Sequence, residues 1–278
     1  MQLPNGRPLR AAFFDIDGTL VNSKGTIGPT TSQEIEQLRR SGVRVGLASG
    51  RPEFGASRVI ADLSITDPCM FFSGALVCLP GAASSPLLEV SLEGAEVHTL
   101  IEALTTQQLY FELYSRSEYF IESDHPLAEM HAGYLHRYPA IAPFKDVIAQ
   151  NPILKLVAAL ESPAQEQAMR ALLSRMPQVH CAFSKGATHD DILFANITSV
   201  KATRDHAFRA LLAACNVSAE ETLAVGDAEA DIPFLRLAGW GLAMANAPLA
   251  VQQQANEVCG SVEQDGLGEW LKKLRASA

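Results

Sequence analysis

The stretch Phe-Phe-Asp-Ile-Asp-Gly-Thr at residues 13–19 decides the fold class. An apolar run, residues 9–14, stops there at two carboxylates placed two positions apart. Side chains alternate along a strand, so Asp15 and Asp17 leave the strand end pointing roughly the same way. Gly18 then allows a sharp turn. Such a pair can hold a hard cation such as Mg²⁺ while one acid acts as a nucleophile, although an Asp-Gly turn after a strand is also a common structural feature.

Strand and helix signals alternate on either side of a different middle region. The first 80 residues predict three strands separated by two helices, at 9–14, 30–40, 43–48, 52–62 and 70–72. The same rhythm returns from residue 201, with a helix over 201–216, a strand over 222–225 and a helix over 228–237. This order predicts an α/β fold with a doubly wound, parallel, Rossmann-like sheet.

The middle of the chain has another character. Paired strands at 109–114 and 119–123, joined at hairpin length, are followed by further strands and helices. This pattern is typical of an α+β domain with an antiparallel sheet. We therefore expect a core domain made of residues 1–81 and 190–278, interrupted by an inserted cap over 82–189.

Composition excludes several classes of protein. The chain has 278 residues, of which 47% are hydrophobic and 19% charged, and its formal net charge is −9. The negative charge argues against a nucleic-acid surface, and no apolar run is long enough for a membrane span. The five cysteines are widely spaced, which favours buried thiols in a reducing cytoplasm over a disulfide framework or a zinc site. Nothing in the sequence indicates an oligomeric state.

Polar residues follow several of the predicted core strands. The carboxyl ends of parallel strands share one edge of the sheet, so these residues can converge there. Lys201, at the start of a predicted helix, can reach the same edge. Asp231 lies one helical turn after Asp227, which places the two carboxylates side by side. The converging residues are Asp15, Asp17, Ser49, Gly50, Arg51, Lys201, Asp227 and Asp231.

These residues resemble the four motifs of the haloacid dehalogenase superfamily, and within it the Cof-type phosphatases with a large α+β cap. The motifs are Asp-Ile-Asp-Gly-Thr at 15–19, Ser-Gly-Arg at 49–51, Lys201, and Gly-Asp-Ala-Glu-Ala-Asp at 226–231, followed by Asn246. The resemblance spans nearly the whole chain. It implies an Mg²⁺-dependent phosphatase acting on a small phosphorylated metabolite, such as a sugar phosphate, a nucleotide or a cofactor phosphate.

The resemblance assigns a role to each acid and cation. Asp15 is the expected nucleophile, which forms an aspartyl-phosphate, and Asp17 is the general acid and base. Lys201 supplies positive charge to the phosphoryl group. Mg²⁺ is expected at Asp15, the Asp17 carbonyl and Asp227.

The other site residues have supporting roles. Asp231 is expected to bind the metal directly or through water. Ser49 is expected to donate a hydrogen bond to a phosphoryl oxygen. The remaining expected substrate or phosphate contacts are Gly18, Gly50, Arg51 and Asn246, of which Arg51 could equally be a surface residue and Asn246 a turn former.

Three positions depart from the family pattern. Ala230 and Ser73 stand where an asparagine is usual, and Ala202 stands where a glycine is usual. Two alternatives stay open: a phosphomutase that passes the phosphoryl group to a second sugar, which the same motifs would serve, and a weakly active metabolite-binding protein, which Ala230 and Ser73 favour. Substrate choice is expected to depend on the cap, where Arg116, His125 and Lys155 are candidates that the sequence does not rank.

Overall fold

The computed structural model describes residues 1–81, 85–185 and 191–276. The chain divides into two compact units. The first contains residues 1–51, 56–88 and 203–278, and the second contains residues 52–55 and 89–202. Among the described residues, no helix combines the length and the hydropathy that crossing a membrane requires.

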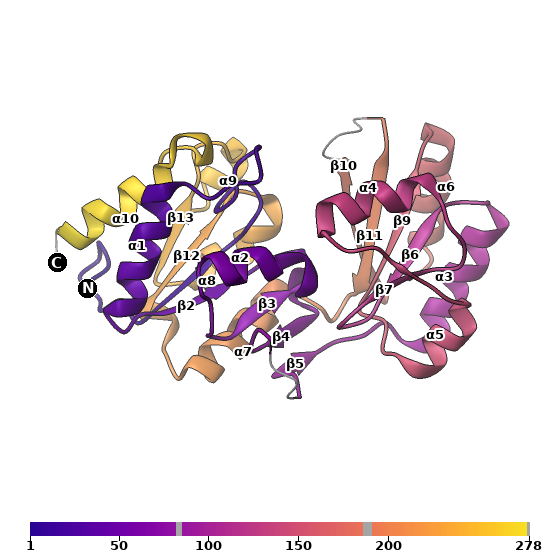
Figure 1. The fold of residues 1–278 in the computed structure, drawn as a ribbon, viewed down its shortest axis with the longest axis horizontal. Helices are drawn as coiled ribbons and strands as arrows, with labels where there is room; N and C mark the ends of the chain where they lie inside the picture. Colours follow the sequence, from indigo (N-terminus) through magenta and orange to yellow (C-terminus); the bar gives the residue numbers. More distant parts are fainter. Residues whose placement is uncertain (82–84, 186–190, 277–278) are drawn as a thin grey trace. The chain divides into compact units, whose positions relative to one another are not determined.

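A parallel sheet forms the centre of the first unit (Figure 1). Its strand order is β14-β13-β12-β1-β2, and all four neighbouring pairs are parallel. The strands are β1 (Ala11–Phe14), β2 (Arg44–Leu47), β12 (Thr222–Gly226), β13 (Trp240–Ala243) and β14 (Glu257–Val258). A parallel bridge from Ala48 to Met70 continues this order to a smaller sheet of β3 (Cys69–Phe71), β4 (Leu76–Cys78) and β5 (Leu88–Glu89). The predicted doubly wound α/β sheet is confirmed.

Helices cover the strands of the first unit. Phe13 of β1 packs edge-on against Phe208, with ring centroids 5.5 Å apart, and Phe234 lies against Phe208 in turn. The helix α10 lies alongside α1 (Figure 1), where Arg275 donates two hydrogen bonds to Glu34, of 2.7 and 2.8 Å. The helices are α1 (Pro29–Arg40), α2 (Ser57–Asp62), α7 (Arg204–Cys215), α8 (Ile232–Leu237), α9 (Leu249–Gln252) and α10 (Gly266–Ala276).

The amino end of α1 is capped by a residue from far along the chain. The side chain of Asp265 accepts hydrogen bonds from the backbone N–H groups of Thr30 (2.6 Å) and Thr31 (3.0 Å). A Cβ on Gly28 would lie 2.2 Å from Oδ1 of Asp265, so this approach requires a glycine. A carboxylate at this place satisfies two backbone donors and also complements the helix dipole.

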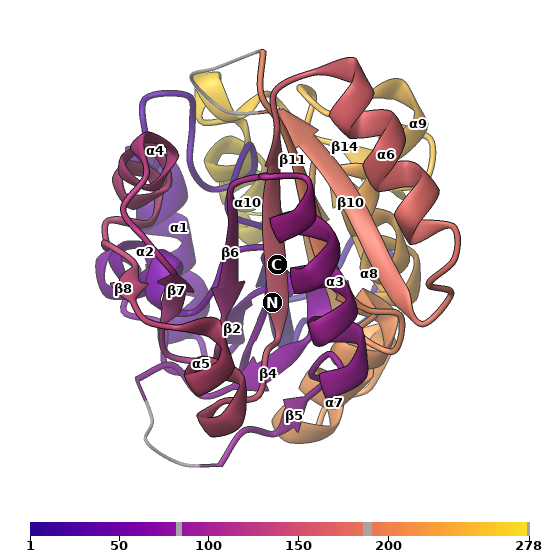
Figure 2. The same cartoon turned by 90° about the vertical axis from the view of Figure 1, so that its right-hand side faces the viewer.

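The second unit is built on a six-stranded sheet with the order β10-β11-β9-β6-β7-β8. Every pair is antiparallel except β7 with β8. Figures 1 and 2 show α3 and α6 on one side of this sheet, where their apolar side chains join those of β6, β9 and β11 in one cluster. The elements are α3 (Gly94–Thr106), β6 (Phe111–Tyr114), β7 (Tyr119–Ile121), α4 (Pro126–Leu135), β8 (Ala140–Ile141), α5 (Phe144–Gln150), β9 (Lys155–Leu160), α6 (Pro163–Leu173), β10 (Val179–Lys185) and β11 (Leu193–Ser199).

The boundaries of the inserted unit differ from the prediction. Residues 191–202, which we expected in the core, belong to the second unit, because β11 pairs there with β9 and β10. Ala195 and Ile197 of β11 contribute to the apolar cluster of that sheet. On the other side, the first unit extends to Leu88, because β5 pairs with β4. The predicted limits 82 and 189 themselves lie outside the described residues.

Candidate active site

The first carboxylate of the site stands at the end of β1. Asp15 is buried, and its N–H donates to the carbonyl of Val225 in β12 at 2.9 Å. The chain then turns at Gly18, with φ +80°. A Cβ on Gly18 would lie 2.2 Å from Oδ2 of Asp227, so only glycine lets the turn approach this second carboxylate. The hydroxyl of Thr19 donates to Oδ1 of Asp227 at 3.3 Å.

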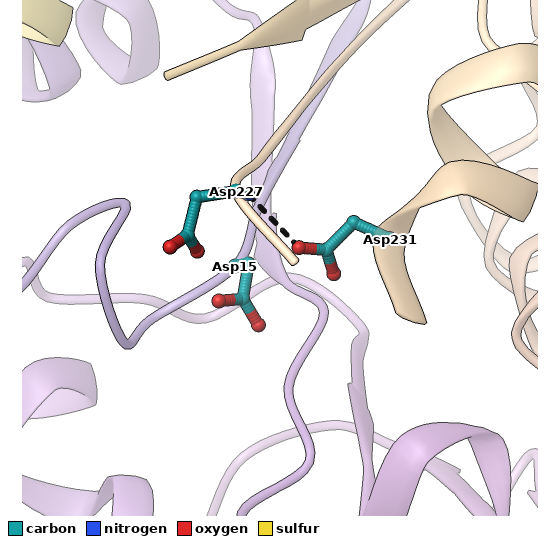
Figure 3. A group of neighbouring side chains, drawn as sticks. All are labelled: Asp15, Asp227 and Asp231. Carbon is teal, nitrogen blue, oxygen red and sulfur yellow. Dashed lines mark hydrogen bonds between the residues drawn. The ribbon is translucent and has the colours of Figure 1, made fainter. Parts of the chain in front are cut away.

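Three carboxylates meet at this edge of the sheet. Oxygen atoms of Asp15, Asp227 and Asp231 lie within 4.8 Å of one another, and Figure 3 shows Asp227 and Asp231 on the two sides of Asp15. Burial and the charge of Asp231 raise the pKa of Asp15 well above its usual value, although the Arg204 guanidinium acts in the opposite direction. Burial and the same neighbour raise the pKa of Asp227 to about 6. Crowded, partly desolvated carboxylates of this kind are a fitting donor set for a hard divalent cation.

Asp231 is the most enclosed of the three. Its side chain is fully buried, and Oδ2 accepts hydrogen bonds from the N–H groups of Asp227 (3.0 Å) and Ala228 (2.8 Å). Oδ1 accepts from Nη1 of Arg204. Both oxygens therefore have protein partners, so Asp231 holds the loop that carries Asp227 and fixes the guanidinium of Arg204.

A buried arginine provides the positive charge beside Asp15. Arg204 is 7% exposed, and its Nη2 lies 3.7 Å from Oδ1 of Asp15. Nη1 donates to the carbonyl of Ala48 at 3.0 Å and to Asp231. A cation at the first residue of α7 opposes the helix dipole, and the two carboxylates offset that cost. This arrangement holds a permanent positive charge next to the expected nucleophile.

The structure corrects the position of the expected cation. We predicted Lys201 at a helix start, but α7 begins three residues later, after the N-cap residue Thr203, whose hydroxyl accepts from the N–H of His206. Lys201 belongs to the second unit, where its side chain is 71% exposed and its Nζ lies 3.1 Å from Oε1 of Glu93. Arg204 therefore occupies the place that we assigned to Lys201.

The sequence contained a signal for Arg204 that we did not use. Ala207, Phe208 and Leu211 form the buried stripe of α7. Arg204 precedes Ala207 by three positions and Phe208 by four. It therefore lies on the same face of α7 as these residues, the face that packs against the sheet. A charged residue on a buried stripe is a sign of a partner within the core.

The Ser-Gly-Arg segment orients the second acid of the first motif. Arg51 donates from Nε to Oδ2 of Asp17 at 2.8 Å and from Nη2 to Oδ1, so both carboxylate oxygens are held. Ser49 is buried, and its Oγ accepts from the N–H of Arg51 at 3.1 Å, which still allows it to donate its own proton. A Cβ on Gly50 would lie 3.2 Å from Oγ of Ser73, so the two loops approach closely here.

The turn after β3 is strained. Phe72, Ser73 and Gly74 have φ values of 51°, 55° and 108°, a region that costs non-glycine residues on the order of 1–3 kcal/mol each. The N–H of Ser73 donates to the carbonyl of Ser49 at 3.1 Å. A Cβ on Gly74 would lie 2.6 Å from the carbonyl oxygen of Thr203. The turn thus joins the loop of Ser49 to the residue that precedes Arg204.

Asn246 connects three loops at the same edge. Its Nδ2 donates to the carbonyl of Gly18 at 2.9 Å and lies 3.3 Å from Oδ2 of Asp227. Its Oδ1 accepts from the N–H of Val262 at 3.0 Å. In this structure Asn246 therefore positions the Asp227 carboxylate and the Gly18 turn.

The sequence matches the family model of the haloacid dehalogenase-like hydrolases over residues 12–271. It is 24% identical over 266 residues to 5-amino-6-(5-phospho-D-ribitylamino)uracil phosphatase of Bacillus subtilis, covering 94% of this chain and 95% of that protein. It is 25% identical over 276 residues to pyridoxal phosphate phosphatase of Escherichia coli, covering 94% and 97%. One further relative is longer, and the chain spans 45% of its length.

Solved structures of other proteins share the fold of this chain. The chain is similar to a haloacid dehalogenase-like hydrolase of Bacteroides thetaiotaomicron with a TM-score of 0.84 and 22% sequence identity. The match covers 96% of this chain and 99% of the other. The likeness therefore extends over both units of the fold.

Proposed function

Because this chain belongs to the haloacid dehalogenase-like hydrolases and is a phosphatase of their Cof type, we propose that it hydrolyses a small phosphorylated metabolite through an aspartyl-phosphate on Asp15. The observation that carries the proposal is the buried Asp15 carboxylate beside the permanent charge of Arg204, with a second acid two residues on. Phosphoryl transfer depends mainly on positioning and on neutralising charge, and these groups provide both.

The reaction has two steps. An oxygen of Asp15 attacks phosphorus, the bond from phosphorus to the leaving oxygen breaks, and that oxygen takes a proton from Asp17. Water then attacks the phosphorus of the aspartyl-phosphate and gives its proton to Asp17, which releases inorganic phosphate and restores Asp15. Arg204 stabilises the negative charge that develops in both steps, and Ser49 donates to a phosphoryl oxygen.

Arg51 has a separate part in this cycle. Because it holds both oxygens of Asp17, it must give up one contact before Asp17 can carry a proton toward the leaving group. Arg51 therefore orients the acid more than it binds phosphate. Gly18 and Gly50 allow the backbone to approach closely, and Asn246 fixes the loop around Gly18.

We propose that Mg²⁺ binds at Asp15, Asp227 and the backbone carbonyl of Asp17. The support is the donor set: two carboxylates with raised pKa values share this edge, and hard oxygen ligands suit this ion. When bound, the ion supplies positive charge that neutralises the phosphoryl oxygens. Asp231 positions these ligands instead of binding the ion, because its carboxylate accepts a hydrogen bond from the N–H of Asp227.

The substrate class comes from the relatives. One relative is named for a phosphorylated ribitylamino-uracil and another for pyridoxal phosphate. We propose a sugar phosphate, a nucleotide or a cofactor phosphate for this chain. Four of its five cysteines are buried and Cys181 is partly exposed, and buried thiols support our placing the protein in the reducing cytoplasm.

The test is phosphate release from a metabolite panel, with Mg²⁺ and with EDTA. Asp15→Asn is nearly isosteric but a poor nucleophile, so it should abolish turnover, whereas the exposed control Asp62→Asn should not. Calorimetric titration with Mg²⁺ should give weaker binding for Asp227→Asn than for the control. Phosphate release by Asp15→Asn at the wild-type rate would refute the proposed nucleophile. A phosphorylated second sugar among the products, detected by phosphorus NMR, would indicate a mutase instead.

A further inference from the structure

A tight turn after β13 carries Asn246 to the carboxylates of the first unit. The N–H of Met244 donates to the carbonyl of Gly226, the residue before Asp227, at 3.1 Å. The N–H of Ala247 then donates back to the carbonyl of Met244 at 3.0 Å, which closes the turn. Asn246 lies inside this turn, so its backbone starts from a point that is anchored beside Asp227.

The contacts that Asn246 makes lie at the surface. The residue is exposed, and its Nδ2 serves the carbonyl of Gly18 and the carboxylate of Asp227 together. Water competes for hydrogen bonds in such a place, so each of them contributes little by itself. The direction of the Asn246 side chain therefore depends on how firmly the backbone of its turn is held.

A glutamine side chain holds that backbone on both sides of Asn246. Nε2 of Gln252, at the end of α9, donates to the carbonyls of Ala245 at 3.1 Å and of Ala247 at 2.8 Å. These are the residues immediately before and after Asn246. A primary amide has two N–H donors, and both are used here. Because Val251 beside it is fully buried in the apolar core of the first unit, α9 gives Gln252 a fixed base.

The two glutamines that follow Gln252 make different contacts. Gln253 is exposed, and its side chain has no hydrogen-bond partner within residues 1–81, 85–185 and 191–276. Oε1 of Gln254 accepts from Nη2 of Arg236. The sequence thus repeats one side chain three times, and the contact with the turn is made by the first. Gln253 is for this reason a matched control for Gln252.

We propose that Gln252 is a positioning residue for the metal site: it holds the carbonyls on both sides of Asn246, and so aims the Asn246 amide at the carboxylate of Asp227. The inference rests on the proposed function, because it concerns the Mg²⁺ proposed there. Gln252 acts through Asn246 and not on the ion itself. A carboxylate that is already held in place loses less freedom when it binds an ion, which strengthens binding.

Calorimetric titration of the full chain with Mg²⁺, in the absence of substrate, tests this role. Gln252→Met keeps the length and the helix propensity of the side chain but removes both donors. We expect its Kd for Mg²⁺ to rise about fivefold, the effect of about one hydrogen bond on a binding constant. Gln253→Met makes the same change at the exposed neighbour and should leave the Kd unchanged. Gln252→Lys restores N–H donors and should recover most of the lost affinity.

A double variant separates this indirect role from a general weakening of the fold. Asn246→Ala removes the group through which Gln252 acts, so Asn246→Ala/Gln252→Met should bind Mg²⁺ no more weakly than Asn246→Ala alone. Thermal unfolding verifies that each variant is folded at the temperature of the titration.

Three results would overturn the inference while the phosphatase function stands. They are a wild-type Kd in Gln252→Met, a Kd in Gln252→Lys as high as that of Gln252→Met, and single effects that multiply in the double variant, as independent effects do. Failure of the wild-type protein to bind Mg²⁺ would instead contradict the metal of the proposed function, and the inference would fall with it.

Discussion

The buried charges around Arg204 should be strongly coupled in their effect on stability. Arg204→Met keeps an apolar stem but removes the guanidinium, and it leaves the fully buried Asp231 without its cation. Leaving one partner of a buried ion pair uncompensated costs about 3–5 kcal/mol. The attraction to Asp15 supports this size, because two unit charges 3.7 Å apart attract by roughly 4 kcal/mol at an effective dielectric constant near 20.

The second variant removes the opposite charge. Asp231→Asn keeps an oxygen for the N–H groups of Asp227 and Ala228, so we expect it to cost about 2–3 kcal/mol. The double variant Arg204→Met/Asp231→Asn removes both members of the Arg204–Asp231 pair, so that of the two carboxylates beside Arg204 only Asp15 then lacks its cation. Its cost should therefore fall short of the sum of the single costs by about 2 kcal/mol.

Urea unfolding followed by tryptophan fluorescence measures these free energies. Both tryptophans, Trp240 and Trp270, lie in the first unit, so the signal reports on the domain that contains the pair. The reasoning would be refuted if the losses in unfolding free energy of the two single variants added up to that of the double variant within about 0.5 kcal/mol, because independent sites behave in that way.

Three further variants test other parts of the structure. Lys201→Ala should change turnover less than twofold and the free energy of unfolding by less than about 1 kcal/mol, because its ion pair with Glu93 is exposed. A loss of activity as large as that of Arg204→Met would show instead that Lys201 supplies the positive charge beside the phosphoryl group. Glu112→Leu should destabilise the second unit by about 3 kcal/mol in differential scanning calorimetry, because buried hydroxyl donors lose their acceptor; an unchanged transition would contradict this. Asp265→Asn should cost about 1 kcal/mol at pH 7 through the weakened cap of α1. Burial raises the pKa of Asp265, but the hydrogen bonds from Thr31 and Thr30 lower it more, so the folded pKa lies below its usual value. Its stabilisation is therefore present at neutral pH and lost as the pH falls through the folded pKa, and the difference between wild type and variant should shrink toward pH 3; a constant difference would contradict the carboxylate as its source.

The parts of the site that follow strands were accessible from the sequence. Asp15 and Asp227 end strands of a parallel sheet, and the topology alone brings such ends to one edge. Ser49 could be placed in the same way, since it follows β2. These predictions need only the order of elements and the alternation of side chains.

Other parts depend on tertiary contacts that a local pattern does not contain. Arg204 and Lys201 lie three residues apart, and only the start of α7 decides which of them faces the sheet. Asp17 is held in position by a hydrogen bond from Arg51. No periodic pattern in the sequence indicates that these two side chains meet. Asp265 caps α1 from more than two hundred positions away. The insert boundary was misplaced because β11 resembles any apolar strand until its partners are known.

The strand order of the first unit has a consequence for synthesis on the ribosome. β1 lies between β2 and β12, and about two hundred residues separate it from β12. At roughly 5–20 residues per second, one edge of β1 waits on the order of 10–40 seconds for its neighbour. During this time the six strands of the second unit, which all lie between residues 111 and 199, can pair among themselves. The nascent chain thus contains a complete inserted sheet while the apolar strand that ends at Asp15 is still unpaired on one side, and an unpaired apolar edge of this kind is prone to aggregation.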